Sequence, residues 1–344
     1  MGVVTENPRA RLSDIAEQAG VSEATVSRVL NDRPGVSSAT RQSVLTALDV
    51  LGYERPMRLR GRSGLVGLIV PELDNPIFPA FAQVMETLLA QHGYTPVLCT
   101  QTPGGVTEDD YVDLLLDRGV AGIIFVSGMH ADSTADHASY RSLVDRGLPI
   151  VLVNGYADGV DAPFISDDDA AAMDLAVTHL VSMGHRRIGL AVGPMRFVPV
   201  VRKRAAFIEA LTRQTGITPD EAGGLVSHSL FGLEGGQAAS HHLLGCGVTA
   251  IVCGSDLMAL GAIRTIRQRG LRVPEDVSVV GYDDSRLIPF TDPPLTTVRQ
   301  AVPAMATAAV QALLDSINHS PAPRDEFVFR PELIVRGSTG PAHE

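Results

Sequence analysis

The sequence has few of the features that mark a membrane-bound, secreted or catalytic protein. Its 344 residues include only three cysteines, Cys99, Cys246 and Cys253, which are too few for a disulfide framework. No apolar run reaches the length of a membrane span, and the first residues lack the apolar core of a signal peptide. These absences predict a protein of the reducing cytoplasm that has no membrane partner.

Motifs for common catalytic sites are also missing. The chain has no G-x-G-x-x-G, no P-loop and no nucleophile elbow. His241, His242 and Cys246 lack a second ligand pair at metal-binding spacing, so we interpret them as ordinary surface and core residues. Three aspartates at residues 167–169 precede an expected helix, where acids act as caps, and this interpretation is preferred to catalysis. We predict no enzyme activity, no metal and no cofactor.

Charge is distributed unevenly along the chain. The net charge is -11, but residues 1–62 hold nine arginines and seven acids, a net of +2 that leaves -13 for the remainder. A small basic end on an acidic body is typical of a protein that contacts phosphate with one end only. The length predicts two or three domains.

Residues 12–31 carry the pattern of two short helices joined by a tight turn. The apolar stripe of the first helix is Leu12, Ile15, Ala16 and Ala19. Gly20 then suits a left-handed helix end, and Ser22 can cap a second helix whose inward residues are Val26, Val29 and Leu30. The pattern predicts a helix-turn-helix whose outward face enters a DNA major groove. That face comprises Glu23, Ala24, Thr25, Ser27, Arg28 and Asn31.

A third helix is expected after a turn at residues 31–36. Ser37 or Ser38 can cap it, and Gly52 can end it. Its expected buried stripe is Val44, Leu45, Leu48 and Leu51. Residues 1–53 are therefore predicted to form a headpiece, followed by an arginine-rich linker at residues 54–64.

From residue 65 onward, apolar strands alternate with amphipathic helices in two rounds, with one helix expected at residues 203–214. Strands that are apolar throughout predict parallel sheets covered on both faces. We therefore predict an α/β core of two doubly wound parallel-sheet subdomains over residues 65–344. A ligand cleft is expected at the carboxyl ends of the strands.

The run A-G-V-S-x-x-T-V-S-R-V-L-N resembles the amino-terminal signature of the LacI/GalR family of bacterial transcription regulators. Further blocks follow in family order, among them N-P-I-F, G-H-R-R-I-G-L, V-P-E-D-V-S-V-V-G-Y-D-D and P-P-L-T-T-V-R-Q. The resemblance implies a periplasmic-binding-protein-like core. Its N-subdomain would cover about residues 65–166 and 300–329, and its C-subdomain about residues 167–299 and 330–338.

The resemblance also assigns DNA contacts. Ser22, Thr25 and Ser27 would set the register on phosphates, as would Ser37, Thr40 and Arg41 around the third helix. In the linker, Leu59, or alternatively Met57, would wedge into the minor groove, and Arg58 would contact phosphate. This linker is about one helical turn shorter than the family pattern, so a hinge helix and a flexible linker both remain open.

The resemblance places a small-molecule effector in the cleft. The implied contact residues are Phe78, Asn154, Arg196, Phe197, Lys203, Phe231, Ser255 and Asp283. Lys203 is the only lysine in the chain, where the family usually carries arginine, and Arg202 or Arg204 could take that role. The alternative for Lys203 is a solvated charge at a helix start.

Several segments resemble actinomycete repressors of maltose and maltodextrin use, including G-P-M-R-F-V-P-V-V-R-K-R. The stretch P-V-V-R-K is less polar than the corresponding family loop, which favours a different effector shape, such as a larger α-glucoside. No leucine heptads follow Arg336, so we expect a homodimer on a near-palindromic operator. Open alternatives are another sugar, a non-sugar metabolite, or a sugar-binding transport component.

Replacing Arg28 tests the predicted recognition helix. Arg28 is expected to donate two hydrogen bonds to a guanine edge, so Arg28→Ala should cost ~1–3 kcal/mol of specific affinity and relax selectivity at one position per half-site. Affinity for operator and random DNA would be compared at fixed salt. An equal loss of affinity for operator and for random DNA would show that Arg28 does not read the base sequence.

Overall fold

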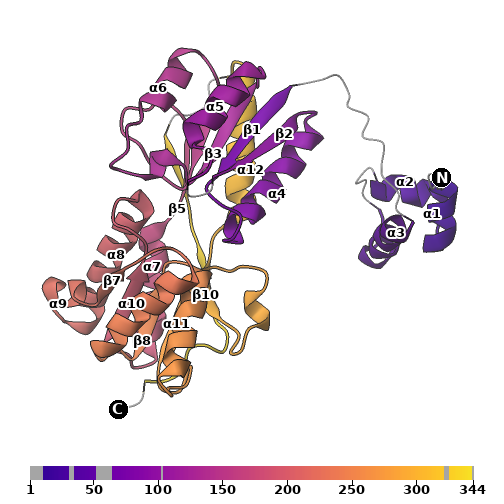
Figure 1. The fold of residues 1–344 in the computed structure, drawn as a ribbon. Helices are drawn as coiled ribbons and strands as arrows, with labels where there is room; N and C mark the ends of the chain where they lie inside the picture. The colour runs from indigo at the N-terminus through magenta and orange to yellow at the C-terminus, as the bar shows by residue number, and fades with distance from the viewer. Residues whose placement is uncertain (1–10, 31–34, 52–63, 102–103, 321–324, 343–344) are drawn as a thin grey trace, which may run out of the picture. The chain divides into compact units, whose positions relative to one another are not determined.

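The computed structural model describes residues 11–30, 35–51, 64–101, 104–320 and 325–342. Two compact units divide the chain, one of residues 1–60 and one of residues 61–344. Figure 1 shows the elements of both units. None of the described helices is long and apolar enough to cross a membrane.

The first unit is a bundle of α1 (Leu12–Ala19), α2 (Glu23–Leu30) and α3 (Ser38–Val50). Gly20 ends α1 in the left-handed conformation with a φ of 65°, as the sequence predicts. The hydroxyls of Ser22 and Ser37 accept hydrogen bonds from the backbone N–H groups of Thr25 (3.2 Å) and Thr40 (3.1 Å). These bonds cap α2 and α3 at the predicted serines.

The predicted buried stripe of α3 is wrong at one position. Leu45 is 46% exposed, whereas Ala47 is only 2% exposed and packs in the bundle core with Ile15, Val26 and Val44. Successive helical residues are about 100° apart, so the stripe that contains Val44 continues through positions three and four residues later. Leu45 lies one step outside that stripe.

The first sheet of the second unit has the strand order β11-β5-β4-β3-β1-β2 among the described residues, and every pairing is parallel. Helices α4 and α12 cover one face, and α5 and α6 cover the other (Figure 1). We call this sheet and its helices the first lobe. Its elements are β1 (Leu65–Val70), α4 (Ile77–Gln91), β2 (Thr95–Thr100), α5 (Glu108–Asp117), β3 (Gly122–Val126), η1 (Met129–Ala131), α6 (Ala138–Asp145), β4 (Ile150–Val153), β5 (Phe164–Asp167), α12 (Val302–Ile317) and β11 (Glu326–Phe329).

The second sheet has the order β12-β10-β9-β8-β6-β7 over the same described ranges, with β12 antiparallel to β10 and the other pairs parallel. Helices α7 and α8 pack together, as do α10 and α11. This second lobe comprises α7 (Asp169–Ser182), β6 (Ile188–Val192), α8 (Val198–Thr215), α9 (Pro219–Gly223), β7 (Val226–His228), α10 (Leu233–Gly245), β8 (Ala250–Cys253), α11 (Asp256–Gln268), β9 (Ser278–Asp283), η2 (Ile288–Phe290), β10 (Thr296–Arg299) and β12 (Glu332–Ile334). The predicted α/β fold of two doubly wound parallel sheets is confirmed.

The described chain passes between the lobes at three crossings, which follow β5, β10 and β11.

One helix of the second lobe starts at a different residue from the one predicted. Helix α8 begins at Val198 rather than near Lys203, because Phe197 has extended backbone angles and Pro199 occupies the first turn, where proline is favoured. Lys203 therefore lies inside the helix, and the P-V-V-R-K stretch is helical rather than a loop.

A buried histidine of the first lobe gives the fold a dependence on pH. Burial lowers the pKa of His130 from 6.5 to about 3, although its hydrogen bond with the Val153 carbonyl opposes this (3.0 Å). Between these pH values the unfolded chain takes up a proton that the folded protein does not, so stability falls as the pH falls from 6.5 toward 3.

His130→Gln removes this titration. Wild type should be more stable than the variant at pH 7.5, and the difference in urea midpoint should shrink steadily at pH 6 and pH 5. A difference that stays constant over this range would show that His130 does not titrate on unfolding.

Candidate functional site

The residues of α2 that the sequence predicts to contact DNA differ in exposure. Glu23, Ala24 and Arg28 are exposed, while Thr25 and Ser27 are half-buried. The hydroxyl of Thr25 lies 3.0 Å from that of Ser22, so these groups also stabilise the helix start. At the start of α3, Ser37 and Thr40 form a similar hydroxyl pair (2.8 Å), and Arg41 follows on the first turn. Asn31, Gly52, Met57, Arg58 and Leu59 lie outside the described residues.

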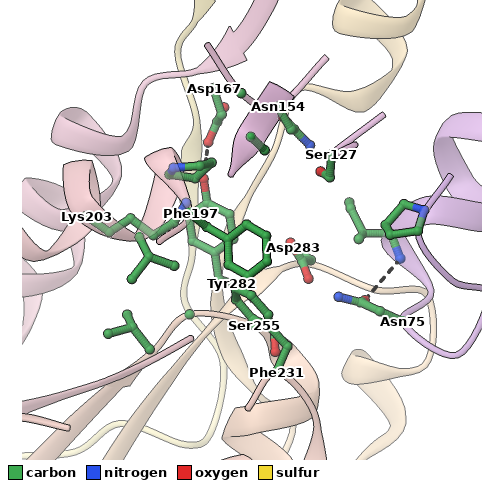
Figure 2. Close-up of a pocket in the computed structure, with 18 of the residues that line it drawn as sticks. Asn75, Ser127, Asn154, Asp167, Phe197, Lys203, Phe231, Ser255, Tyr282 and Asp283 are labelled. Carbon is green, nitrogen blue, oxygen red and sulfur yellow. Dashed lines mark hydrogen bonds between the residues drawn. The ribbon is translucent and has the colours of Figure 1, made fainter. Parts of the chain in front are cut away.

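A cavity of about 440 Å³ lies between the two lobes at the carboxyl ends of their strands. The structure brings the eight predicted effector residues together around it: Phe78, Asn154, Arg196, Phe197, Lys203, Phe231, Ser255 and Asp283. Figure 2 shows Asn75, Ser127 and Asn154 of the first lobe facing Phe197, Phe231 and Asp283 of the second. Residues more than 200 positions apart thus share one pocket.

Aromatic rings form one side of the pocket. The centroids of Phe197 and Phe231 are 5.8 Å apart, and the guanidinium of Arg196 lies 4.8 Å from the centroid of Phe197. Arg196 also forms an ion pair with Asp132 of the first lobe (2.8 Å). Gly193 makes room for one ring, since a Cβ there would lie 2.2 Å from Cζ of Phe231.

Asp283 is buried at the end of β9. The side-chain amide of Gln300 donates a hydrogen bond to its Oδ1 (2.7 Å). Burial raises the pKa of Asp283 well above its usual value, and the nearby carboxylate of Asp256 raises it further. Ser255, which also lines the pocket, caps α11 by accepting a hydrogen bond from the N–H of Met258 (3.2 Å).

Lys203 is not a solvated charge at a helix start, contrary to the alternative considered above. It is 7% exposed, its ammonium donates to Asp169, and it lies 4.2 Å from the centroid of the Tyr282 ring. Its arginine neighbour is also engaged: Arg202 donates to both carboxylate oxygens of Glu326 in β11 (2.6 and 3.0 Å). Arg204 is not among the described residues that line the pocket.

The three aspartates at residues 167–169 are only partly explained by helix capping. Asp168 caps α7 through the N–H of Ala171 (2.9 Å), as expected. Asp167 and Asp169, however, line the pocket, and the hydroxyl of Tyr282 donates to Asp167. Burial raises the pKa of Asp167 to about 6, although Tyr282 and Lys203 oppose the shift.

Four buried polar atoms of the pocket have no hydrogen-bond partner among the described residues. They are Ser166 Oγ, Asp167 Oδ1, Asp283 Oδ2 and Gln300 Oε1. Such atoms are costly to leave without partners, so a bound molecule with several donors would stabilise them. Of these residues the sequence indicated only Asp283. Ser166, Asp167 and Gln300 also stand at strand ends, and that position is the signal that could have identified them.

Comparison with known proteins gives matches along both units. A model described as bacterial regulatory proteins of the lacI family matches residues 11–55, and one described as a periplasmic binding protein-like domain matches residues 177–339. The HTH-type transcriptional regulator MalR of Streptomyces coelicolor is 66% identical over 334 residues, which cover 96% of this chain and 97% of that protein.

Two solved structures are similar over nearly the whole chain. A complex of the transcriptional regulator CelR with cellobiose has a TM-score of 0.70 and 33% identity, covering 96% of this chain and 100% of that one. The lac repressor dimer bound to operator and the anti-inducer ONPF has a TM-score of 0.69 and 28% identity, covering 96% and 99%.

The close approach of Phe231 to Gly193 provides a test of the aromatic side. Gly193→Ala should displace the ring. A maltodextrin such as maltotriose, the ligand class that the sequence resemblance leads us to expect, should then bind about fivefold more weakly, since loss of an aromatic contact costs roughly 1 kcal/mol. Isothermal titration calorimetry measures this. The matched control is Gly245→Ala at the end of α10, where an added Cβ meets no atom within 4 Å. Equal affinities for both variants and wild type would show that the ring does not contact the sugar.

Proposed function

Because the chain belongs to the LacI family of bacterial regulatory proteins and is a DNA-binding transcription regulator, we propose that it is a repressor controlled by a neutral α-glucoside. The headpiece binds the operator through α2, with Arg28 on a guanine edge and Glu23 and Ala24 on neighbouring bases. Maltose or a short maltodextrin binds in the pocket between the lobes and changes the affinity for DNA. The regulated genes serve carbohydrate use.

The observation that carries the effector proposal is the set of four buried atoms without partners beside an aromatic wall. Each sugar ring presents several hydroxyl donors and an apolar face. The hydroxyls satisfy carboxylate and amide oxygens, and the apolar face stacks on Phe197 and Phe231. The pocket therefore matches a carbohydrate in both kinds of contact.

Charge in the pocket favours a neutral ligand over a sugar phosphate. Asp167, Asp169 and Asp283 are buried there, and the buried ammonium of Lys203 is already paired with Asp169. The guanidinium of Arg202 is paired with Glu326. An anionic ligand would therefore meet the carboxylate of Asp167, and among the described residues that line the pocket no unpaired buried cation balances its charge.

Similarity to MalR of Streptomyces coelicolor supports the choice of an α-glucoside, since it agrees with the sequence resemblance to repressors of maltose and maltodextrin use. The similar CelR structure holds cellobiose, which supports a glucose oligomer as the ligand class. A transport component would need the core alone, and it would not explain the headpiece. The relatives are regulators rather than enzymes, so we assign no reaction to the pocket.

The assembly proposed is a homodimer on a near-palindromic operator, in the cytoplasm. Two headpieces related by a two-fold axis read two half-sites, so operator symmetry follows protein symmetry. The similarity to the lac repressor dimer on its operator supports this arrangement. The effector acts through its different affinity for the DNA-bound and free states.

Fluorescence anisotropy with labelled DNA from beside the protein's own gene tests the proposal. At fixed salt, the protein should bind this DNA more tightly than random DNA. Maltose and maltotriose should weaken that binding, whereas lactose, ribose and glucose 6-phosphate should not. Specific DNA binding that neither maltose nor maltotriose changes would leave the regulator assignment intact and contradict the proposal of an α-glucoside effector. A response to glucose 6-phosphate alone would overturn the argument from charge.

A further inference from the structure

The turn that follows β9 is strained. Asp283 and Asp284 have φ angles of 112° and 58°, a region that glycine adopts readily and other residues rarely do. Two successive non-glycine residues in this region persist only where surrounding contacts hold them. Because Asp283 lines the pocket, the contacts that hold the turn also aim a carboxylate at the ligand.

Asp284 supplies those contacts through two arginines. Its Oδ2 accepts a hydrogen bond from Nε of Arg299 (2.7 Å), and its Oδ1 accepts one from Nη2 of Arg336 (2.6 Å). The Asp284 side chain is 7% exposed and that of Arg336 is 15% exposed, so this ion pair is largely shielded from water, whereas Arg299 is 47% exposed. On the other side of the turn, the N–H of Ser285 donates to Asp256 (2.7 Å).

Both arginines stand beside crossings between the lobes. Arg299 ends β10 at the second crossing, and the next residue, Gln300, is the one that donates to Asp283. Arg336 follows β12, just after the third crossing, and its other amino group donates to the carbonyl of Leu295 (2.8 Å). Arg299 also pairs with Glu332 at the start of β12 (3.5 Å). One carboxylate therefore joins two crossings to the pocket.

We propose that Asp284 is a positioning residue that couples ligand contact at Asp283 to the geometry of the two crossings. A ligand that moves Asp283 must also move Asp284, since the two share one strained turn. Through its ion pairs, Asp284 then transmits the displacement to Arg299 and Arg336, and so to the second and third crossings between the lobes. This inference rests on the proposed function of the pocket as the effector site.

Asp284→Asn is the direct test, because asparagine tolerates positive φ but lacks the charge that holds the arginines. The variant should bind operator within twofold of wild type when no sugar is present. Its Kd for maltotriose should rise about tenfold. At saturating maltotriose, the change in operator affinity should be at least fivefold smaller than in wild type. Loss of a residue that only stabilises the fold would not alter this change in operator affinity at saturating sugar.

The matched control is Asp276→Asn. Asp276 also accepts from one arginine through both oxygens, with Arg272 Nε and Nη2 each at 2.9 Å, but it lies away from the pocket. The control should keep the wild-type Kd and the wild-type response. A wild-type response in Asp284→Asn would overturn the proposal, and so would a loss of operator binding without sugar, since that indicates general structural damage.

Hydrogen exchange of the sugar-free proteins separates this inference from the choice of effector. If maltotriose does not change operator binding by wild type in the anisotropy experiment, the proposal of an α-glucoside effector is wrong. The exchange data then test the role of Asp284 by themselves. Peptides covering residues 283–302 and 330–337 should exchange at least fivefold faster in Asp284→Asn than in wild type, while residues 169–182 should be unchanged. Unchanged exchange at both crossings, or equal acceleration in α7, overturns the role of Asp284.

Discussion

The pocket depends on the burial of carboxylates and on the donors that make this burial possible. Five acidic side chains are buried at the pocket or the turn beside it: Asp167, Asp169, Asp256, Asp283 and Asp284. A buried charge without partners costs several kcal/mol, so each carboxylate requires donors in fixed positions. These donors come from α8, β9 and β10 and from the residues that directly follow β10 and β12. The hydrogen bonds that pair these acids therefore also hold the second lobe against the second and third crossings.

This pairing is incomplete on the side that faces the cavity. In the described protein, one oxygen of Asp167 and one of Asp283 have no partner, and burial raises the pKa of both carboxyls. On our proposal, the hydroxyls of the sugar supply those missing hydrogen bonds and favour the charged forms of both carboxyls.

Much of the fold could be predicted because its signals are local. Strands buried on both faces have continuous apolar runs, and the helix ends of the headpiece carry Gly20, Ser22 and Ser37 at positions where only a few residue types serve. The errors arise where packing decides between neighbours. Leu45 is as apolar as the residues of the core, but it lies on a side of α3 that faces solvent rather than the bundle. The predicted start of α8 is wrong because that prediction places the apolar residues of the first turn in a loop.

The candidate site was less predictable because its decisive contacts join distant residues. Lys203 is the only lysine in the sequence, yet nothing near it in the sequence indicates that its partner is Asp169, 34 residues away. Asp284 is a sharper case, since the two arginines that pair with it are 15 and 52 residues distant. A local pattern records what a residue prefers, whereas we infer that distant charges help to hold this turn at its positive φ angles. On our proposal, this strain lets a ligand at Asp283 act on the crossings directly, because the pocket and the second and third crossings share one cluster of charged side chains.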